Sequence, residues 1–331
     1  SVNFRDLKDW RSFPAAPAGP GAGITPMNWN NNFQNNPYWV LETNTNKYDR
    51  DRFTGAAFAT YQFVKEFSAT GKVSLDHYDE LTSVRQAKGS NNAPDGFYGE
   101  NVKRYSEVNA EFTLAYKKQI TEDINFSFNF GGNKMKRTIT QNGGTIAGLE
   151  LPDFYNLSNV KSGVTPNLYN VYNEVRIGSL LGYGQISYKD LVFIDYSGRN
   201  DWASVLPKAN NSFFYPAISG SLVLSEVFQT QETAFNYIKV RGGWSKVGGT
   251  GALTAYNLNS TYDLNNNGWG NQAQTPNTQF NPNLKPESVV GIEGGLDINL
   301  FENRVRFAGT YYSKTSSDLL VPVQVSAATG Y

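Results

Sequence analysis

The chain has 331 residues, with 29 basic and 29 acidic side chains, one histidine and no cysteine. A formal net charge of zero argues against nucleic-acid binding, which requires a basic surface. The lack of cysteine excludes a disulfide framework, a thiolate metal site and a cysteine nucleophile, and the single His77 excludes metal motifs that need two histidines. These exclusions remove most common enzyme chemistries, so we expect no enzymatic activity.

The composition combines many aromatic residues with a low hydropathy. Aromatic side chains make up 14% of the chain, yet its mean hydropathy is −0.47. No apolar run approaches the ~18–20 residues that a membrane helix needs. A transmembrane β-barrel satisfies both figures, because its strands are apolar only at alternate positions and its lumen and loops are polar. We therefore expect an all-β chain that forms part of an outer-membrane barrel.

Residues 1–52 are rich in turn-forming residues. Prolines and glycines are dense between Pro14 and Gly23, and asparagines are dense between Asn28 and Asn36. This composition predicts a loop region that leads into a barrel segment at 53–331. The chain starts without the basic and apolar parts of a signal peptide, and no closing element follows its last predicted strand. We therefore expect it to be an internal part of a longer protein.

Hydrophobic and polar side chains alternate over about ten later segments. In the clearest example, phenylalanines at 126, 128 and 130 alternate with polar residues. A period of two is typical of β-strands, and several segments are longer than the usual globular strand of ~5–6 residues. The predicted strands are 53–63, 68–84, 102–117, 124–140, 174–188, 191–200, 213–224, 237–247, 287–299 and 304–318.

The same alternation predicts which side chains meet lipid. A cation on the lipid face at mid-bilayer costs ~2–4 kcal/mol, so a shift of register by one residue is penalised. The side chains expected to face lipid are Phe126, Phe128, Phe130, Ile238, Val240, Ile292 and Phe307. Those expected to face the lumen are Asn125, Asn129, Lys239, Arg241, Glu293 and Arg306. We also expect an open wall, in which the first and last predicted strands do not pair.

Short and long links alternate between the predicted strands. The short links are 64–67, 119–123, 189–190 and 301–303, and the link at 225–236 is of medium length where a short one is expected. The long links, rich in Asn, Gly, Pro and Ser, are 85–101, 141–173, 201–212 and 248–286. Antiparallel strands reverse at every link, so all long links lie at one end of the sheet. Short periplasmic turns and long extracellular loops are typical of outer-membrane barrels.

One loop segment could bind a cation. Asp263 to Gly268 resembles the start of a calcium loop, with oxygen ligands at alternating positions and glycine sixth. Gln274 stands where such a loop needs a bidentate carboxylate, and Asn-Gly turn chemistry explains the same residues. We therefore expect no cofactor, with calcium at Asp263 as the minor alternative.

His77 lies near three carboxylates, Asp76, Asp79 and Glu80. Such a group could act in acid–base chemistry, but no serine or cysteine is specifically placed as a nucleophile. We interpret His77 as a solvated side chain near the end of a strand.

Five short blocks, in order, carry a family resemblance. They are Asn36-Pro37-Tyr38-Trp39 with Asp51-Arg52-Phe53-Thr54-Gly55; Tyr196-Ser197-Gly198-Arg199-Asn200-Asp201-Trp202-Ala203-Ser204; Phe213-Phe214-Tyr215-Pro216 with Ser219-Gly220-Ser221; Lys239-Val240-Arg241-Gly242-Gly243-Trp244-Ser245; and Asn281-Pro282-Asn283-Leu284-Lys285-Pro286-Glu287. Together they resemble the barrel of the SusC/RagA family of TonB-dependent outer-membrane transporters of Bacteroidetes.

The resemblance implies a barrel of 22 strands with a plug inside, of which about ten strands would be present here. It also implies a location in a Bacteroidetes-type outer membrane, in contact with its lipid. The implied partners are a SusD-like surface lipoprotein and the TonB–ExbB–ExbD complex. The latter would act through a plug region that is absent from this chain.

Two sets of residues are candidates for function. Loop aromatics stack on sugars and anchor protein interfaces, so we consider Trp10, Trp29, Tyr38, Trp39 and Trp269 as ligand or partner contacts. Local loop packing is the competing interpretation of the same residues. The family motif contributes Gly198, Arg199, Asn200, Asp201 and Trp202. Arg199 could clamp a ligand, although we favour a conformational role where the strand leaves the bilayer, with Trp202 at the interface.

The leading functional hypothesis is TonB-dependent import of oligomeric nutrients, either glycan or peptide, with a SusD-like lid. The alternative is a transporter-like barrel that serves as a structural or secretion-associated component of a larger complex. A passive porin is a weaker third possibility.

Overall fold

A computed structural model describes most of the chain. The described residues are 7–8, 35–230, 233–251, 253–256, 258, 261–266, 271–274, 279–321, 323–324, 326 and 328. Trp10, Trp29 and Trp269 lie outside them, as do the side chains of 263–266.

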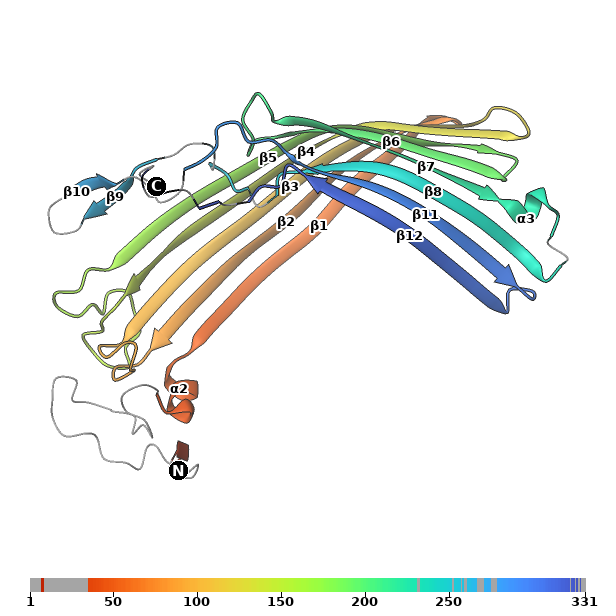
Figure 1. Ribbon diagram of the computed structural model, residues 1–331. Helices are drawn as coiled ribbons and strands as arrows, with labels where there is room; N and C mark the ends of the chain where they lie inside the picture. Colours follow the sequence, from red (N-terminus) through yellow and green to blue (C-terminus); the bar gives the residue numbers. More distant parts are fainter. Residues whose placement is uncertain are drawn as a thin grey trace. The chain divides into compact units, whose positions relative to one another are not determined.

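Within the described residues, ten strands form one sheet in which neighbours in sequence are neighbours in space (Figure 1). β1 and β12 are the first and last strands of the order, so the predicted open wall is confirmed. The strands are β1 (Asn46–Val64), β2 (Phe67–Gln86), β3 (Phe97–Gln119), β4 (Ile124–Ile146), β5 (Asn167–Tyr188), β6 (Val192–Ala203), β7 (Ser212–Val223), β8 (Phe235–Gly249), β11 (Glu287–Leu300) and β12 (Val305–Ser317).

All ten predicted strands are confirmed, but several extend further toward the long links. β1 begins at Asn46, inside the region 1–52 that was expected to be loop, and β4 continues to Ile146. These extensions have polar residues on both faces, as in Asn46–Arg52, and therefore lack the hydrophobic alternation that marked the strands. They are held instead by cross-strand ion pairs: Arg52 donates to Asp76 on β2 at 2.8 and 2.7 Å.

Four short elements were not predicted. Helix α2 (Pro37–Thr43) begins after Asn36, whose side chain accepts a hydrogen bond from the Tyr38 amide at 2.9 Å. Helix α3 (Leu224–Val227) occupies the medium link between β7 and β8. The strands β9 (Asp263–Asn266) and β10 (Asn271–Gln274) form a separate antiparallel pair inside the long link after β8. Among the described residues, no helix has the length and apolar character needed to cross a membrane.

The turn between β5 and β6 is tight, as predicted, although the link is 189–191 and thus one residue longer than expected. Lys189 and Asp190 both have left-handed backbones, with φ of 51° and 54°. Two successive left-handed residues give a turn of the type I′ kind, whose twist matches that of the flanking strands. The chain thus makes this hairpin without the Asn-Gly pair that usually marks it.

The register confirms that the two predicted sets of residues on β8, β11 and β12 lie on opposite faces of the sheet. Residues opposite each other in an antiparallel pair share a face. Ile238 lies opposite Ile298, which lies opposite Phe307, whereas Lys239 lies opposite Asp297. The predicted lipid-facing and lumen-facing side chains of these strands therefore alternate between two faces. We call the apolar one the outward face and the polar one the lumen face.

The described chain divides into two compact units. Unit 1 contains the described parts of Ser1–Thr54, with Asp76–Glu107 and Thr138–Asn173; unit 2 contains Gly55–Leu75, Val108–Arg137 and the described parts of Glu174–Tyr331. Each unit has a hydrophobic core built partly from its long links. The core of unit 1 consists of Tyr98, Ile146 and Leu149 with Tyr155, Leu157 and Val160. The core of unit 2 consists of Ala203, Val205 and Leu206 with Val175, Ile177, Phe213, Leu253 and Leu284.

Candidate functional site

The family motif lies at the end of β6, where the strand enters the link 204–211. Its residues alternate between the two faces of the sheet. The register places Arg199 opposite Tyr215 and Asp201 opposite Ser179, on the lumen face. Trp202 lies opposite Gly178 on the outward face. The motif therefore divides into a lumen-facing ionic half and an outward-facing half.

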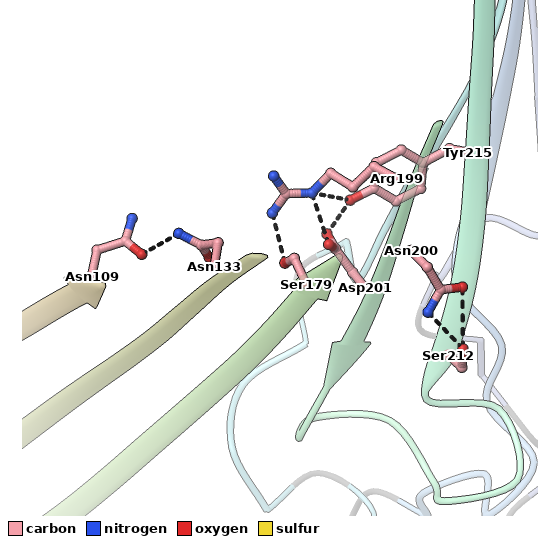
Figure 2. A network of polar contacts seen from close by, with 8 residues as sticks. All are labelled: Asn109, Asn133, Ser179, Arg199, Asn200, Asp201, Ser212 and Tyr215. Carbon is pink, nitrogen blue, oxygen red and sulfur yellow. Dashed lines mark hydrogen bonds and ion pairs between the residues drawn. The ribbon is translucent and has the colours of Figure 1, made fainter. Parts of the chain in front are cut away.

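The lumen-facing half is a closed hydrogen-bond network (Figure 2). Arg199 Nε donates to Asp201 Oδ1 at 2.8 Å and to the Tyr215 hydroxyl at 3.0 Å, and Nη2 donates to Ser179 Oγ at 2.8 Å. The Tyr215 hydroxyl donates to the other carboxylate oxygen of Asp201. Three strands are thus tied together through one guanidinium group.

Burial makes this network costly to break. Asp201 is only 8% exposed, and Ser179 is 5% exposed. A buried carboxylate needs its cation and donors, because an unpaired buried charge is strongly destabilising. Arg199 supplies that cation, with part of its side chain still exposed on the lumen face.

The outward-facing half of the motif joins β6 to β7. Asn200 Nδ2 donates to Ser212 Oγ at 3.0 Å, next to the link between the two strands. Gly198 leaves room for the ring of Phe214, two atoms of which would lie 3.0 Å from a Cβ at this position. Trp202 is 40% exposed, in a position suited to the membrane interface that we predicted for it.

The hydrophobic core of unit 2 lies directly beyond this network on the same face. Ile177 lies opposite Ala203. Both are next to the outward-facing pair Gly178 and Trp202 in sequence, so both lie on the lumen face. Val205 and Leu206 of the link fold onto them and are 2% and 3% exposed. We call this lumen-facing cluster, made of the unit 2 core residues, the ledge.

Hydrogen bonds fix the ledge to the ends of the strands. Arg176 N donates to Ser204 Oγ at 2.9 Å, and Ser204 N donates back to the Arg176 carbonyl at 2.9 Å. Asn210 Nδ2 donates to the carbonyl of Leu284 at 3.1 Å, which connects two of the long links. Backbone N–H and C=O groups around the ledge are thus hydrogen-bonded, as expected of an ordered structure.

A second polar contact on the lumen face joins β3 to β4. The side chains of Asn133 and Asn109 are hydrogen-bonded to each other (Figure 2). Their amides give the wall a neutral hydrogen-bonding surface in this place. Asn109 and Asn133 lie within the predicted strands 102–117 and 124–140, but no functional role was predicted for them.

The long links of unit 1 are also ordered. Asn159, 5% exposed, accepts from the Leu151 amide at 2.9 Å and donates to the Leu151 carbonyl at 2.8 Å. Tyr155 packs on the core of this unit, where burial and then the charge of Asp153 raise the pKa of its hydroxyl. The guanidinium of Arg85 lies 5.0 Å from the centre of the Tyr155 ring. These contacts fold the link onto the ends of the strands.

The predicted loop aromatics separate into different environments. Trp39 lies in α2 and is fully buried, whereas its neighbour Tyr38 is 37% exposed. In this structure Trp39 therefore packs locally, and Tyr38 is the one of the two whose side chain is exposed. A contact of either residue with a ligand or partner stays a prediction, as it does for Trp10, Trp29 and Trp269.

Each of the three carboxylates around His77 pairs with an arginine. His77 Nε2 lies 3.4 Å from Asp79, which also accepts from Arg104 at 2.7 Å. Asp76 and Glu80 instead pair with arginines of β1, Arg52 and Arg50. Among the described residues, no three His, Cys, Asp or Glu side chains are grouped as a metal site. Calcium at Asp263 stays untested, because the side chains of that segment lie outside the described part.

Comparison with known proteins agrees with this architecture. The family described as TonB dependent receptor-like, beta-barrel matches residues 3–331. TonB-dependent receptors P26 and P3 of Formosa agariphila are 29% and 26% identical to the chain over 314 and 302 residues. These alignments cover 89% and 87% of the chain but only 31% and 29% of the relatives. The chain therefore spans about a third of their length.

A solved structure gives the same fold. The RagAB peptide transporter superposes with a TM-score of 0.80 at 20% identity, covering 90% of this chain and 33% of that one. This likeness agrees with the resemblance to the SusC/RagA barrel noted in the sequence. The chain belongs to the family of TonB-dependent receptor-like β-barrels and is part of a barrel wall in the bacterial outer membrane.

Proposed function

We propose that the chain forms part of the wall of a transporter that imports oligomeric nutrients, glycan or peptide, in a TonB-dependent manner. The observation that carries the proposal is the ledge. Its hydrophobic core is folded onto the lumen face, directly beyond the Arg199 network. A ledge folded onto this face would take up part of the barrel interior, and such an obstruction suits gated passage of a bound solute better than free diffusion.

The lumen face supplies the chemistry for such a ligand. Asn109, Asn133, Ser219 and Thr310 offer neutral donors and acceptors, and Lys239 and Glu293 add separate charges. Peptides and glycans both present amides or hydroxyls that such groups bind. The description of RagAB as a peptide transporter concerns that protein, but the shared fold makes peptides a reasonable first class to test.

The proposal includes a surface lipoprotein of the SusD type as a lid, and coupling to TonB–ExbB–ExbD through a plug outside this chain. Exposed Tyr38 and Phe154 of unit 1 are suitable anchors for the lid, since aromatic residues are enriched at interfaces, and exposed Leu151 adds apolar surface. Trp10, Trp29 and Trp269 are further proposed contacts.

Uptake assays test the import function. Cells that express the full-length protein should accumulate labelled oligopeptides or oligosaccharides only while the proton-motive force is intact. Uptake that continues after its collapse would contradict active import and favour a passive porin.

Purification from mild detergent tests the lid separately. We expect the tagged full-length barrel to carry a surface lipoprotein in a stable complex. A barrel that runs alone, while uptake stays energy-dependent, would contradict the lid and leave the import function standing.

A further inference from the structure

Basic side chains follow the lipid-facing aromatics on the outward face of β4. Phe128 lies on this face. Its ring stacks on the ring of Tyr196, with the two ring centres 6.3 Å apart. Tyr196 lies on the outward face, because it is opposite Ile218, which is opposite Trp244 and through it Ile292. Alternation puts Lys134 and Lys136 on the same face, further along the strand. Both side chains are exposed. The outward face therefore changes from aromatic to cationic within a few residues.

This change occurs one bilayer thickness from the periplasmic turns. A tilted strand crosses the hydrocarbon core in ~9–11 residues. Lys134 is the tenth residue after Ile124, the start of β4, and Trp202 is the tenth after Val192, the start of β6. Both residues therefore reach the level where the hydrocarbon ends and the head groups of the outer leaflet begin.

A third cation from β5 completes the group. Glu174 accepts an ion pair from Lys136 Nζ at 3.1 Å and one from Arg176 Nη2 at 2.6 Å. The Glu174 side chain is 15% exposed, whereas those of Lys136 and Arg176 are 51% and 61% exposed. The carboxylate is thus shielded beneath two exposed cations. We call Lys134, Lys136 and Arg176 the outer basic cluster.

Open space adjoins the cluster. A Cβ at Gly178 would meet no atom within 4 Å, and Gly178 lies opposite Trp202 on the outward face. On β4, the Cβ position of Gly132 is 3.5 Å from Leu180, which places Lys134 beside the Gly178 position on the next row. The position of Gly178, which carries no side chain, therefore lies open between a cation and an interfacial aromatic ring.

We propose that the outer basic cluster binds the anionic groups, phosphate or carboxylate, of glycolipid in the outer leaflet. The cluster faces away from the lumen, so it does not serve the imported solute. It carries three cations against one shielded anion, and cationic groups at a membrane surface attract anionic head groups. The long stems of Lys and Arg can cover apolar surface while their charges reach the head groups. The open position at Gly178 leaves room for part of the glycolipid beside Trp202.

Retention of lipopolysaccharide by the full-length protein tests this inference. The protein is purified in neutral detergent at low salt, and lipopolysaccharide per barrel is measured by mass spectrometry. In the triple variant Lys134→Gln, Lys136→Gln, Arg176→Gln we expect retention to fall at least about fivefold. The single variant Lys134→Gln, which leaves the Glu174 pairs intact, should show a smaller loss.

The matched control carries the same charge change at the periplasmic end. Its substitutions are Lys65→Gln, Lys118→Gln and Lys189→Gln, and we expect wild-type retention. Phosphatidylglycerol vesicles and inorganic phosphate are added as competitors, and neither should displace the glycolipid. Unchanged retention in the triple and single variants, an equal loss in the control, or displacement by either competitor would overturn the proposal.

Discussion

At the scale of single residues, Arg199 forms side-chain hydrogen bonds with more residues than any other member of the motif does. It connects Asp201, Tyr215 and Ser179, which come from three strands. Alternation alone predicts that Arg199 and Asp201 share a face, and the family resemblance drew attention to them. The partners Ser179 and Tyr215 could not be predicted, because cross-strand neighbours depend on register, which a single sequence does not reveal.

The Arg199–Asp201 pair can be tested with a double-mutant cycle. We expect Arg199→Gln to lower the free energy of unfolding by about 1.5–3 kcal/mol, because the buried carboxylate loses its charged partner. Asp201→Asn should have a comparable effect, and the double variant should cost less than the sum of the two. The measurement is urea unfolding of the full-length barrel in lipid vesicles. Strictly additive effects would show that the two groups are not coupled.

At the scale of strands, hydrophobic alternation was sufficient to predict every member of the main sheet. It failed where both faces of a strand are polar, as in Asn46–Arg52, since no alternation remains there. It also missed α2, where Asn36 caps a helix in a stretch that composition marked as loop. Strand signals therefore weaken where the chain leaves the bilayer, while tertiary ion pairs continue the sheet.

Two glycines of β5 give a matched test of strand packing. A Cβ at Gly184 would overlap the carbonyl oxygen of Ser127 on β4 and would crowd the ring of Tyr196, whereas a Cβ at Gly178 would meet no atom within 4 Å. We expect Gly184→Ala to cost about 1–3 kcal/mol through forced strand movement. Gly178→Ala should stay within about 0.5 kcal/mol of wild type. Heat-modifiable gel mobility and urea unfolding would measure both, and equal effects would contradict the close approach at Gly184.

At the scale of the whole molecule, each compact unit has its own core, and the long links supply much of each. The links were predicted only as loops, because their few apolar residues follow no period. Leu149 in unit 1 is fully buried, and Val205 in unit 2 is 2% exposed. Their burial shows why extracellular loops of this length can be ordered: the apolar area that they bury offsets the entropy of ordering them.

Reciprocal cavity variants in the full-length protein test whether the two cores are independent. Leu149→Ala should cost about 2–5 kcal/mol locally, and Val205→Ala should also destabilise the core around it, because truncation removes buried apolar contacts. Hydrogen exchange should then show lost protection in 87–96 and 147–166 for the first variant, and in 204–211 for the second. Strands within the bilayer should keep their protection in both, because lipid and cross-strand hydrogen bonds hold them. If either substitution deprotected both sets of links, the cores would form a single cooperative unit. If ligand uptake fell with Val205→Ala alone, the ledge would be the part of the wall that controls passage.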